Sequence, residues 1–325
     1  MRAIQVAEHG EPEVLRPVEA AAPEPGPGEV AIDVAYAGVN FADIKARRSG
    51  YRVTSLPFRP GLEVSGRVRS VGAGVTGLRT GQEVAALTSG GGYAELALAP
   101  AATVFPVPAG LPLRTAATLP TVLPTAHALL HEAGRLRPGD TVLVQGAAGG
   151  VGTVVGQLAR LAGAGAVYGV VSRPEKAEHA LKYGYDHVFV GGDWAERLAR
   201  ATAGRGADLI LDSDGGEALR RSLEALAPFG RIVNFGNSSD EGPWRFGRAE
   251  LDPGARAVTS FSILTLARTA PEALRALSER AFALVADGSA ELPVTAEFPL
   301  ERAAEAHRLI ESRTTTGKLL LRVAG

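Results

Sequence analysis

Short apolar runs separated by glycine- and proline-rich turns dominate the first third of the chain. Segments such as APEPGPGE and SVGAGVTGLRTGQ reverse the chain between these runs, and a glycine turn at residues 90–92 leads into another. Apolar runs of this length, bounded by such turns, are typical of strands. The pattern predicts a compact, barrel-like, all-β module over residues 1–120. Its expected strands span residues 3–6, 29–36, 63–71 and 83–86.

Helical segments interrupt this module once and then mark its end. Residues 40–47 form one short local helix in the prediction, and residues 113–134 are again helical and apolar. We expect Pro120 and Pro124 to break the second segment, because proline lacks the N–H that a helix interior needs. This segment is the expected crossing into a second domain.

From residue 141 onward, apolar strands alternate with helical patterns. This alternation predicts a doubly wound parallel sheet of six strands, and hence an α/β fold of the Rossmann type. Ligands bind at the carboxyl ends of such strands, so Gly236, Asn237 and Ser238 are candidate site residues. The expected strands are 141–144, 167–171, 187–190, 208–212, 231–235 and 258–266, and the helices between them are 154–162, 176–183, 194–202 and 217–226.

The tail contains two further helices and two further strands. The helices are expected at 271–286 and 300–312, and the strands at 294–298 and 318–323. Because six strands already fill the parallel sheet, we expect the two tail strands to return to the first module. The predicted organisation is therefore a β-rich domain (1–120), a nucleotide-binding domain (121–261) and a returning C-terminal segment (262–325).

A glycine turn joins the first strand of the alternating region to its first helix. Gly146, Gly149, Gly150 and Gly152 follow the strand with the spacing G-x-x-G-x-x-G. Glycines let the backbone approach a pyrophosphate, and the following helix points unpaired N–H groups at the anion. Strand, turn, helix and second strand together predict dinucleotide binding; a purely structural glycine turn is the alternative.

The end of the second strand indicates which dinucleotide binds. An NAD site places Asp or Glu there, whereas this chain has Ser172, Arg173 and, shortly after, Lys176. A hydroxyl and two cations suit a 2′-phosphate, which a carboxylate would repel. These residues favour NADPH. The alternative, that both cations are only solvated charges at a helix start, is weakened because cations are unfavourable there.

Composition excludes several classes of function. The chain has 325 residues, a net charge of −1 and no cysteine. Its charge gives no reason to expect a nucleic-acid partner, and the lack of cysteine excludes disulfides and thiolate metal sites. We see neither an apolar signal region at the N-terminus nor an apolar run of membrane-spanning length, so we expect a cytoplasmic protein.

A few polar side chains have two readings. Asn40 precedes the short helix, where it could cap the helix or contact the ribose or amide of a cofactor. His127 lies beside Thr125 and could approach a site, although a packed helix histidine is the simpler interpretation. Asp212 and Asp214 end a strand, and we expect them to form a turn rather than a catalytic carboxylate pair. The six histidines show no metal-ligand spacing.

Several separate stretches resemble one family. They are NFADIKARRSGY, LPFRPGLEVSG, LRPGDTVLVQGAAGGVG, GRIVNFGNSS and IESRTTTGKLLL. Together they resemble the zinc-free medium-chain dehydrogenase/reductases, especially the NADPH:quinone oxidoreductase or zeta-crystallin-like branch. The resemblance implies a GroES-like catalytic domain and a Rossmann nucleotide-binding domain.

The resemblance also implies particular cofactor contacts. One expected feature is missing, since relatives often carry a tyrosine after the third strand, where this chain has Gly191. The implied contacts are Asn40 and Thr125 near the nicotinamide end, Gly150 and Val151 at the pyrophosphate, Ser172 and Lys176 at the 2′-phosphate, Phe235, Gly236 and Phe261 around the nicotinamide, and Arg313 closing over the cofactor.

The same resemblance points away from zinc chemistry. Metal-dependent relatives hold zinc with Cys and His and carry Gly-His-Glu where this chain has Gly61-Leu62-Glu63. Without zinc to polarise an alcohol, alcohol oxidation is disfavoured. The expected reaction is hydride transfer from NADPH to an acceptor that is already electron-poor, such as a quinone or an α,β-unsaturated carbonyl.

Three functional readings remain open from sequence. The first is a quinone reductase, the second an enoyl reductase of polyketide type, and the third a non-catalytic NADPH-binding protein. For the second, Tyr51 is a candidate proton donor, because polyketide enoyl reductases carry a tyrosine at the matching spacing; simple packing at the lip of the cleft is the alternative. The apolar strand at 258–266 would lie at a sheet edge, which predicts a homodimer.

Overall fold

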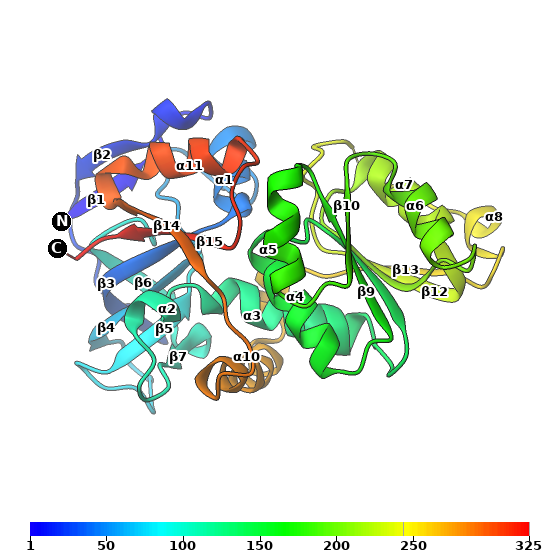
Figure 1. The fold of residues 1–325 in the computed structure, drawn as a ribbon. Helices are drawn as coiled ribbons and strands as arrows, with labels where there is room; N and C mark the ends of the chain where they lie inside the picture. Colours follow the sequence, from blue (N-terminus) through cyan, green and yellow to red (C-terminus); the bar gives the residue numbers. More distant parts are fainter. Residues whose placement is uncertain (243, 325) are drawn as a thin grey trace. The chain divides into compact units, whose positions relative to one another are not determined.

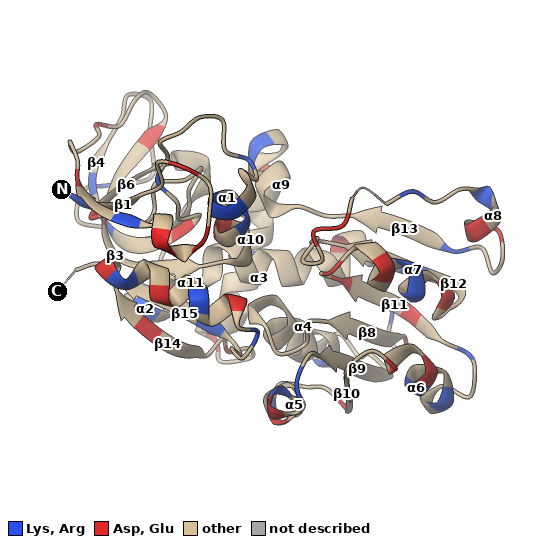
Figure 2. Cartoon of the chain, turned by 90° about the horizontal axis from the view of Figure 1, so that it is seen from above, with Lys and Arg blue, Asp and Glu red and all other residues tan. Residues whose placement is uncertain are grey.

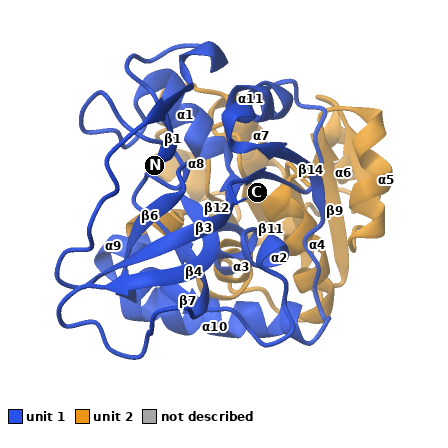
Figure 3. Cartoon of the chain, turned by 90° about the vertical axis from the view of Figure 1, so that its left-hand side faces the viewer, with its two compact units in different colours: residues 1–124, 266–325 blue, residues 125–265 orange. Residues whose placement is uncertain are grey.

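The chain forms two main sheets, one in each of two units. The computed structural model describes residues 1–242 and 244–324. Unit 1 comprises Met1–Pro124 and Leu266–Gly325, and unit 2 comprises Thr125–Thr265 (Figure 3). Helix α3 (Leu119–Ala128) and helix α9 (Ile263–Thr269) each cross a boundary between the units.

Unit 1 is built on a seven-stranded sheet. Its strand order is β14-β15-β3-β4-β5-β7, with β6 paired to β3, and β1 (Arg2–Gln5) and β2 (Arg16–Glu19) form a separate pair (Figure 1). The two C-terminal strands enter this sheet because β15 pairs antiparallel with β3, with Leu321 opposite Ala37. The strands are β3 (Glu29–Val39), β4 (Glu63–Val71), β5 (Glu83–Leu87), β6 (Leu96–Pro100), β7 (Val104–Pro106), β14 (Val294–Pro299) and β15 (Lys318–Arg322).

Apolar side chains of these strands form the core of unit 1. Alternate residues of β3, including Val30 and Ile32, pack with Leu319 and Leu321 of β15, and all four are buried. Successive side chains point to opposite faces of a strand, and both faces of β15 are covered, because Leu319, Leu320 and Leu321 are all buried. The helical elements of unit 1 are α1 (Phe41–Ser49), α2 (Leu113–Ala116), α10 (Pro271–Ala286), α11 (Ala303–Glu311) and the short 3-10 turns at Pro12–Val14, Ala101–Thr103 and Leu300–Arg302.

Pro120 and Pro124 are expected to break the helical segment 113–134. The segment does break just before Pro120, between Ala116 and Leu119, but the break expected at Pro124 is wrong. Helix α3 runs through Pro124, and a π-helical turn, Leu129–Ala133, extends it. Pro120 lies in the first turn, where the backbone N–H has no partner in the helix. Pro124 lies inside the helix and is buried, as are Val122 and Leu123. Burial of this apolar segment therefore outweighs the missing hydrogen bond.

Unit 2 is a doubly wound sheet of six parallel strands, in the order β10-β9-β8-β11-β12-β13. This confirms the predicted fold class. The strands are β8 (Thr141–Gln145), β9 (Ala166–Val171), β10 (His187–Val190), β11 (Ala207–Asp212), β12 (Leu226–Asn234) and β13 (Ala257–Ser260). The helices are α4 (Gly150–Leu161), α5 (Ala177–Lys182), α6 (Trp194–Ala201), α7 (Gly216–Glu224) and α8 (Arg248–Leu251), with a 3-10 turn at Pro174–Lys176.

The last strand of this sheet is shorter than predicted. The sequence predicts one strand over 258–266, but β13 ends at Ser260 and α9 begins at Ile263. The Oγ of Ser262 accepts a hydrogen bond from the N–H of Thr265, which caps the new helix. An apolar run of this length fits either a strand or a helix, and the cap decides between them.

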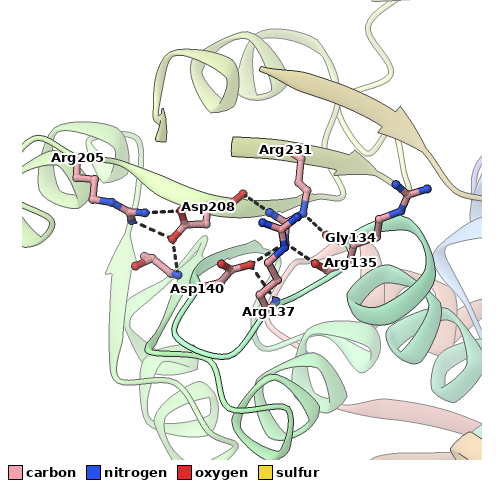
Figure 4. Close-up of polar contacts among 8 residues, drawn as sticks. Gly134, Arg135, Arg137, Asp140, Arg205, Asp208 and Arg231 are labelled. Carbon is pink, nitrogen blue, oxygen red and sulfur yellow. Dashed lines mark hydrogen bonds and ion pairs between the residues drawn. The ribbon is translucent and has the colours of Figure 1, made fainter. Parts of the chain in front are cut away.

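One arginine ties the amino ends of three parallel strands together. Arg231 of β12 donates to the carbonyl oxygens of Gly134, Arg135 and Asp208 and to the carboxylate of Asp140 (Figure 4). Asp208 of β11 in turn accepts from Arg205 and from the N–H of Thr141 at the start of β8. This network lies at the opposite end of the sheet from the glycine turn, so its role is to fix the strands.

Residues of both charge signs occur on helices and loops of each unit (Figure 2). Their totals nearly cancel, with a net charge of −1. No described helix is both long enough and apolar enough to span a membrane.

Candidate functional site

The glycine turn of unit 2 has the geometry of an anion cradle. Gly146 follows β8 with a φ of +67°, a conformation that favours glycine. A Cβ on Gly152 would lie 2.4 Å from the carbonyl oxygen of Gly146, so no other residue fits there without opening the turn. Gly149 is the N-cap of α4 and supplies no capping side chain. The first N–H groups of α4, from Gly150 and Val151 onward, are therefore available to an anion.

The end of β9 presents cations and a hydroxyl next to this cradle in the fold. Ser172 and Arg173 follow the strand and are exposed, and Lys176 ends the short 3-10 turn after them. The pKa of the nearby His179 is lowered by burial and also by the charges of Lys182 and Lys176. Lys176 and Lys182 therefore act on this side chain of α5, and ammonium groups are suitable partners for a phosphate.

Two turns at the carboxyl ends of β11 and β12 are held together by a buried carboxylate. Oδ1 of Asp212 accepts from the N–H of Gly215 and from the side chain of Asn234, both at 2.8 Å. Burial raises the pKa of Asp212 to about 6, although these hydrogen bonds act in the opposite direction. A Cβ on Gly236 would lie 2.4 Å from the carbonyl oxygen of Ser213. Asp212 thus forms a turn, as predicted, but it also joins two loops.

The predicted residues near these turns fall into one neighbourhood of unit 2. Phe235 donates its N–H to Asp212, and Phe261 donates its N–H to Asn234, so both aromatic residues flank the same strand ends. Phe235, Gly236 and Phe261 are half-buried, and Asn237 is exposed. Ser238 is half-buried and donates to Asp214 at 2.6 Å, and Thr125 is buried on α3.

Three predicted residues belong to unit 1. Tyr51 is 39% exposed; Arg52 donates to its hydroxyl at 3.1 Å, and the Lys45 ammonium lies 5.9 Å from its ring centre. Arg313 is exposed after α11 and has a φ of +56°. Asn40 is the N-cap of α1, and Asp43 at the third helical position accepts its backbone N–H, as in a capping box. The Asn40 amide also contacts charged side chains.

Those charged side chains are Glu63 and Lys318, which sequence reasoning missed. Lys318 donates to Glu63 Oε1 at 2.5 Å, with side chains only 3% and 0% exposed. The Asn40 amide bridges them, donating to Glu63 at 3.0 Å and accepting from Lys318 at 2.8 Å. The signal that could have found them is a charged residue at the first position of each strand, directly before a buried apolar residue: Glu63 before Val64 in β4, and Lys318 before Leu319 in β15.

A second buried carboxylate supports the backbone beside Asn40. Asp43 accepts from the N–H of Asn40 at 3.0 Å and from the N–H of Gly61 at 3.1 Å. Burial raises the pKa of Asp43 to about 7, and these two hydrogen bonds oppose that shift. Asn40 is therefore fixed through both its backbone and its side chain.

Two family models match this chain. One, described as the alcohol dehydrogenase GroES-like domain, covers residues 26–109, and the other, described as zinc-binding dehydrogenase, covers residues 150–280. The residues do not fit a zinc site. The chain has no cysteine, and the described residues contain no group of three or more His, Asp or Glu that could hold a metal ion.

Relatives match over nearly the whole chain. A quinone oxidoreductase of Pseudomonas aeruginosa is 35% identical over 98% of both chains, and a probable quinone oxidoreductase of Schizosaccharomyces pombe is 34% identical over 98% of this chain and 96% of its own. A phthioceranic/hydroxyphthioceranic acid synthase of Mycobacterium tuberculosis is 34% identical over 92% of this chain, which corresponds to 14% of that protein.

Solved structures match equally well. The Escherichia coli quinone oxidoreductase complexed with NADPH has a TM-score of 0.93 at 32% identity and covers 99% of this chain and 100% of its own. A mycobacterial protein complexed with NADPH also has a TM-score of 0.93, at 34% identity, with the same coverage.

Proposed function

This chain belongs to the quinone oxidoreductases of the medium-chain dehydrogenase/reductase family, and we propose from that premise that it transfers hydride from NADPH to a quinone or another electron-poor conjugated carbonyl. The observation that carries the proposal is the glycine cradle followed by cations, from Gly146 to Lys176. The similarity to two structures complexed with NADPH supports it.

The residues present suit NADPH and an acceptor that needs no metal. NADPH supplies a hydride when bound, and the first turn of α4 would hold its pyrophosphate. Ser172, Arg173 and Lys176 would hold the 2′-phosphate through charge-assisted hydrogen bonds. Because the described residues contain no group of ligands that could hold a metal ion to polarise an alcohol, the acceptor must take up negative charge itself, as a quinone does through its carbonyl oxygens.

The other cofactor contacts remain assignments carried over from the family. Asn40 and Thr125 would contact the nicotinamide end, and Phe235, Gly236 and Phe261 would line its pocket. Asn237 follows these at the end of β12, and Arg313 would close over the cofactor.

The test is turnover with defined acceptors. NADPH oxidation is followed by its absorbance with a benzoquinone and, separately, with an enone. We expect turnover with the quinone and much weaker turnover with NADH. If neither acceptor supports NADPH oxidation although NADPH binds, the chain is a non-catalytic binding protein, and the proposal fails.

A second candidate function is enoyl reduction. It is favoured by the match to one segment of a phthioceranic/hydroxyphthioceranic acid synthase and by Tyr51, whose side chain is 39% exposed. Hydride addition to an enone leaves an enolate that needs a proton, and a phenol is a suitable acid for it. Arg52 and Lys45 would stabilise the phenolate that remains.

Tyr51→Phe separates the two activities. If Tyr51 is the donor, enone turnover or the stereochemistry of protonation changes while quinone turnover persists, because a hydroquinone anion can take its proton from water. If both activities and the product configuration stay as in the wild type, Tyr51 has a packing role only.

We also propose a homodimer that acts in the cytoplasm. Strand β13 pairs with β12 and with no other described strand, so its outer edge can pair with a second copy. The cytoplasmic location stays a prediction; the lack of cysteine supports it, because the fold does not depend on disulfides.

A further inference from the structure

The buried ion pair of unit 1 spans a strand that lies between its partners. Glu63 begins β4 and Lys318 begins β15, and β3 separates these two strands in the sheet. Glu63 is opposite Gly38 of β3, where a Cβ would lie 2.2 Å from the carboxylate oxygen. Glycine at position 38 therefore makes room for the glutamate side chain to lie across β3. Lys318 reaches the same place from the other side and also donates to the carbonyl oxygen of Val39 at 3.2 Å.

Stability alone does not explain this pair. Removing two charges from water costs several kcal/mol, and a buried ion pair replaced by well-packed apolar residues is often equally stable. The polar contacts of the pair indicate a different role. Glu63 Oε1 and the Lys318 ammonium hold opposite ends of the Asn40 amide, and Glu63 Oε2 accepts the N–H of Thr121 in the first turn of α3 at 2.8 Å.

These contacts allow the Asn40 amide only one orientation. Rotating the amide by half a turn would place its NH₂ group against an ammonium and its oxygen against a carboxylate. Each contact uses one of the two amide hydrogens and one of the two lone pairs on the oxygen. Asn40 is only half-buried, so a ligand can approach its side chain, and the second amide hydrogen would be presented in a direction that the ion pair sets.

We propose that Glu63 and Lys318 are positioning residues for hydride transfer, which fix the orientation of the Asn40 amide toward the nicotinamide end of NADPH. This inference rests on the proposed contact of Asn40 with the cofactor. Neither charged residue touches the reacting atoms; both act through Asn40. The ligand chemistry is a hydroxyl or an amide whose oxygen accepts the second amide hydrogen of Asn40.

The experiment is a double-mutant cycle between the ion pair and Asn40. Glu63→Gln/Lys318→Met removes both charges together and so leaves neither charge buried without its partner. Asn40→Ala removes the amide, and a triple variant combines the changes. Arg322→Met is the matched control, because Arg322 lies on the same strand but is exposed. For each variant, we measure quinone turnover under NADPH saturation, the NADPH dissociation constant and the melting temperature.

We expect the double variant to lower kcat roughly ten- to a hundredfold, as misplacement by about an ångström does, while its melting temperature stays close to that of the wild type. In the Asn40→Ala background, the same two changes should have little further effect on kcat. If the Glu63–Lys318 pair had only a structural role, the double change would lower kcat equally in the wild-type and Asn40→Ala backgrounds, and that result would overturn the proposal. Wild-type kcat in the double variant would overturn it too.

The same set of variants separates this inference from the proposed function. If Asn40→Ala alone leaves kcat and NADPH affinity unchanged, the assumed contact of Asn40 with the cofactor is wrong, and the positioning proposal falls with it. If Asn40→Ala lowers kcat but the ion pair does not couple to it, the cofactor contact stands and only the positioning proposal fails. If the wild-type protein shows no quinone turnover at all, the proposed function itself is refuted.

Discussion

At the scale of single residues, burial gives two titratable groups of unit 1 opposite pKa shifts. The imidazole of His307 is buried, with its Nε2 3.1 Å from the Tyr93 hydroxyl. Burial, together with the charge of Arg47, lowers its pKa to about 3. Burial raises the pKa of Asp43 to about 7. Folding therefore favours the neutral form of both side chains.

These two shifts make opposite contributions to the pH dependence of stability. Below about pH 6.5 the unfolded chain protonates His307 and the folded chain does not, so the histidine lowers the free energy of unfolding as pH falls toward 3. Between about pH 4 and 7 the folded chain keeps the proton on Asp43 that the unfolded chain loses, so this residue lowers stability as pH rises. Each contribution has a slope of up to about 1.4 kcal/mol per pH unit.

We predict that His307→Gln and Asp43→Asn change the pH profile in opposite directions. When the pH falls from about 7 to about 5, the free energy of unfolding of His307→Gln should rise relative to that of the wild type. Over the same change in pH, that of Asp43→Asn should fall relative to the wild type. Urea unfolding at both pH values measures this, each variant serving as the control of the other. Parallel profiles for both variants and the wild type would show that neither group titrates differently in the folded chain.

Lys176 is the residue on which the choice of cofactor can be tested. A charge-assisted hydrogen bond contributes about 1.5–3 kcal/mol, so we predict that Lys176→Ala weakens NADPH binding by roughly one to two orders of magnitude and leaves NADH binding nearly unchanged. Fluorescence titration with each cofactor measures both. Arg200→Ala, an exposed cation on α6, is the control. Equal affinity of the wild type for both cofactors would contradict the assignment.

The sequence could predict the residues whose role follows from a local pattern, but not those whose role depends on pairing between distant strands. The glycines from Gly146 to Gly152 define their own turn. Glu63, Lys318 and Asn40 meet only because β15 pairs with β3, a contact between residues nearly three hundred positions apart. Asn40 alone therefore left two readings open, a helix cap or a ligand contact.

At the scale of elements, the glycine turn and α4 form one unit with little tolerance for side chains. We predict that Gly152→Ala weakens NADPH binding at least tenfold and lowers stability by about 1–3 kcal/mol, because a Cβ 2.4 Å from a carbonyl oxygen forces the turn open. Gly192→Ala is a suitable control, since the nearest atom to its Cβ would be 3.9 Å away. Calorimetric titration and thermal unfolding give the two quantities. Wild-type binding by Gly152→Ala would exclude the turn as the pyrophosphate site.

The type and bounds of an element were predictable where the hydrophobic periodicity was strong. They were less predictable where the periodic run contains a helix cap or a proline. The parallel strands of unit 2 follow from their continuous apolar runs. The run from Val258 to Leu266 suits a strand and a helix equally, and only the cap from Ser262 divides it. Pro124 within α3 shows that burial of a whole helix can outweigh a local preference.

At the scale of the whole molecule, the fold class was predictable because each sheet has its own sequence signature. Turn-rich strands give the antiparallel sheet of unit 1, and strand–helix alternation gives the parallel sheet of unit 2. The count of six strands in the parallel sheet also left the two tail strands without a place in it. The proposed assembly with a second copy follows less directly from the sequence, because it depends on the outer edge of β13, which pairs with no other described strand.

That edge is the basis of the last prediction, a homodimer formed through β13. The residues of β13 are mostly exposed. The unpaired edge of this strand is nevertheless expected to favour association. The N–H of Phe261 points toward β12, where it donates to Asn234. The direction of the backbone N–H alternates along a strand. The N–H of Thr259 therefore also points toward β12, and that of Val258 points away from β12, to the outer edge. Val258→Pro removes a donor from the outer edge and leaves the inner ladder intact.

Light scattering at micromolar concentration should give twice the chain mass of 33.6 kDa for the wild type. Val258→Pro should shift the equilibrium to the monomer, because the edge loses a hydrogen bond in each of the two copies and proline disfavours pairing on that side. Thr259→Ala, which changes a neighbouring exposed side chain but keeps every outward N–H, should remain dimeric. A monomeric wild type would remove the proposal, and a dimer that Val258→Pro leaves intact would place the interface elsewhere on the chain.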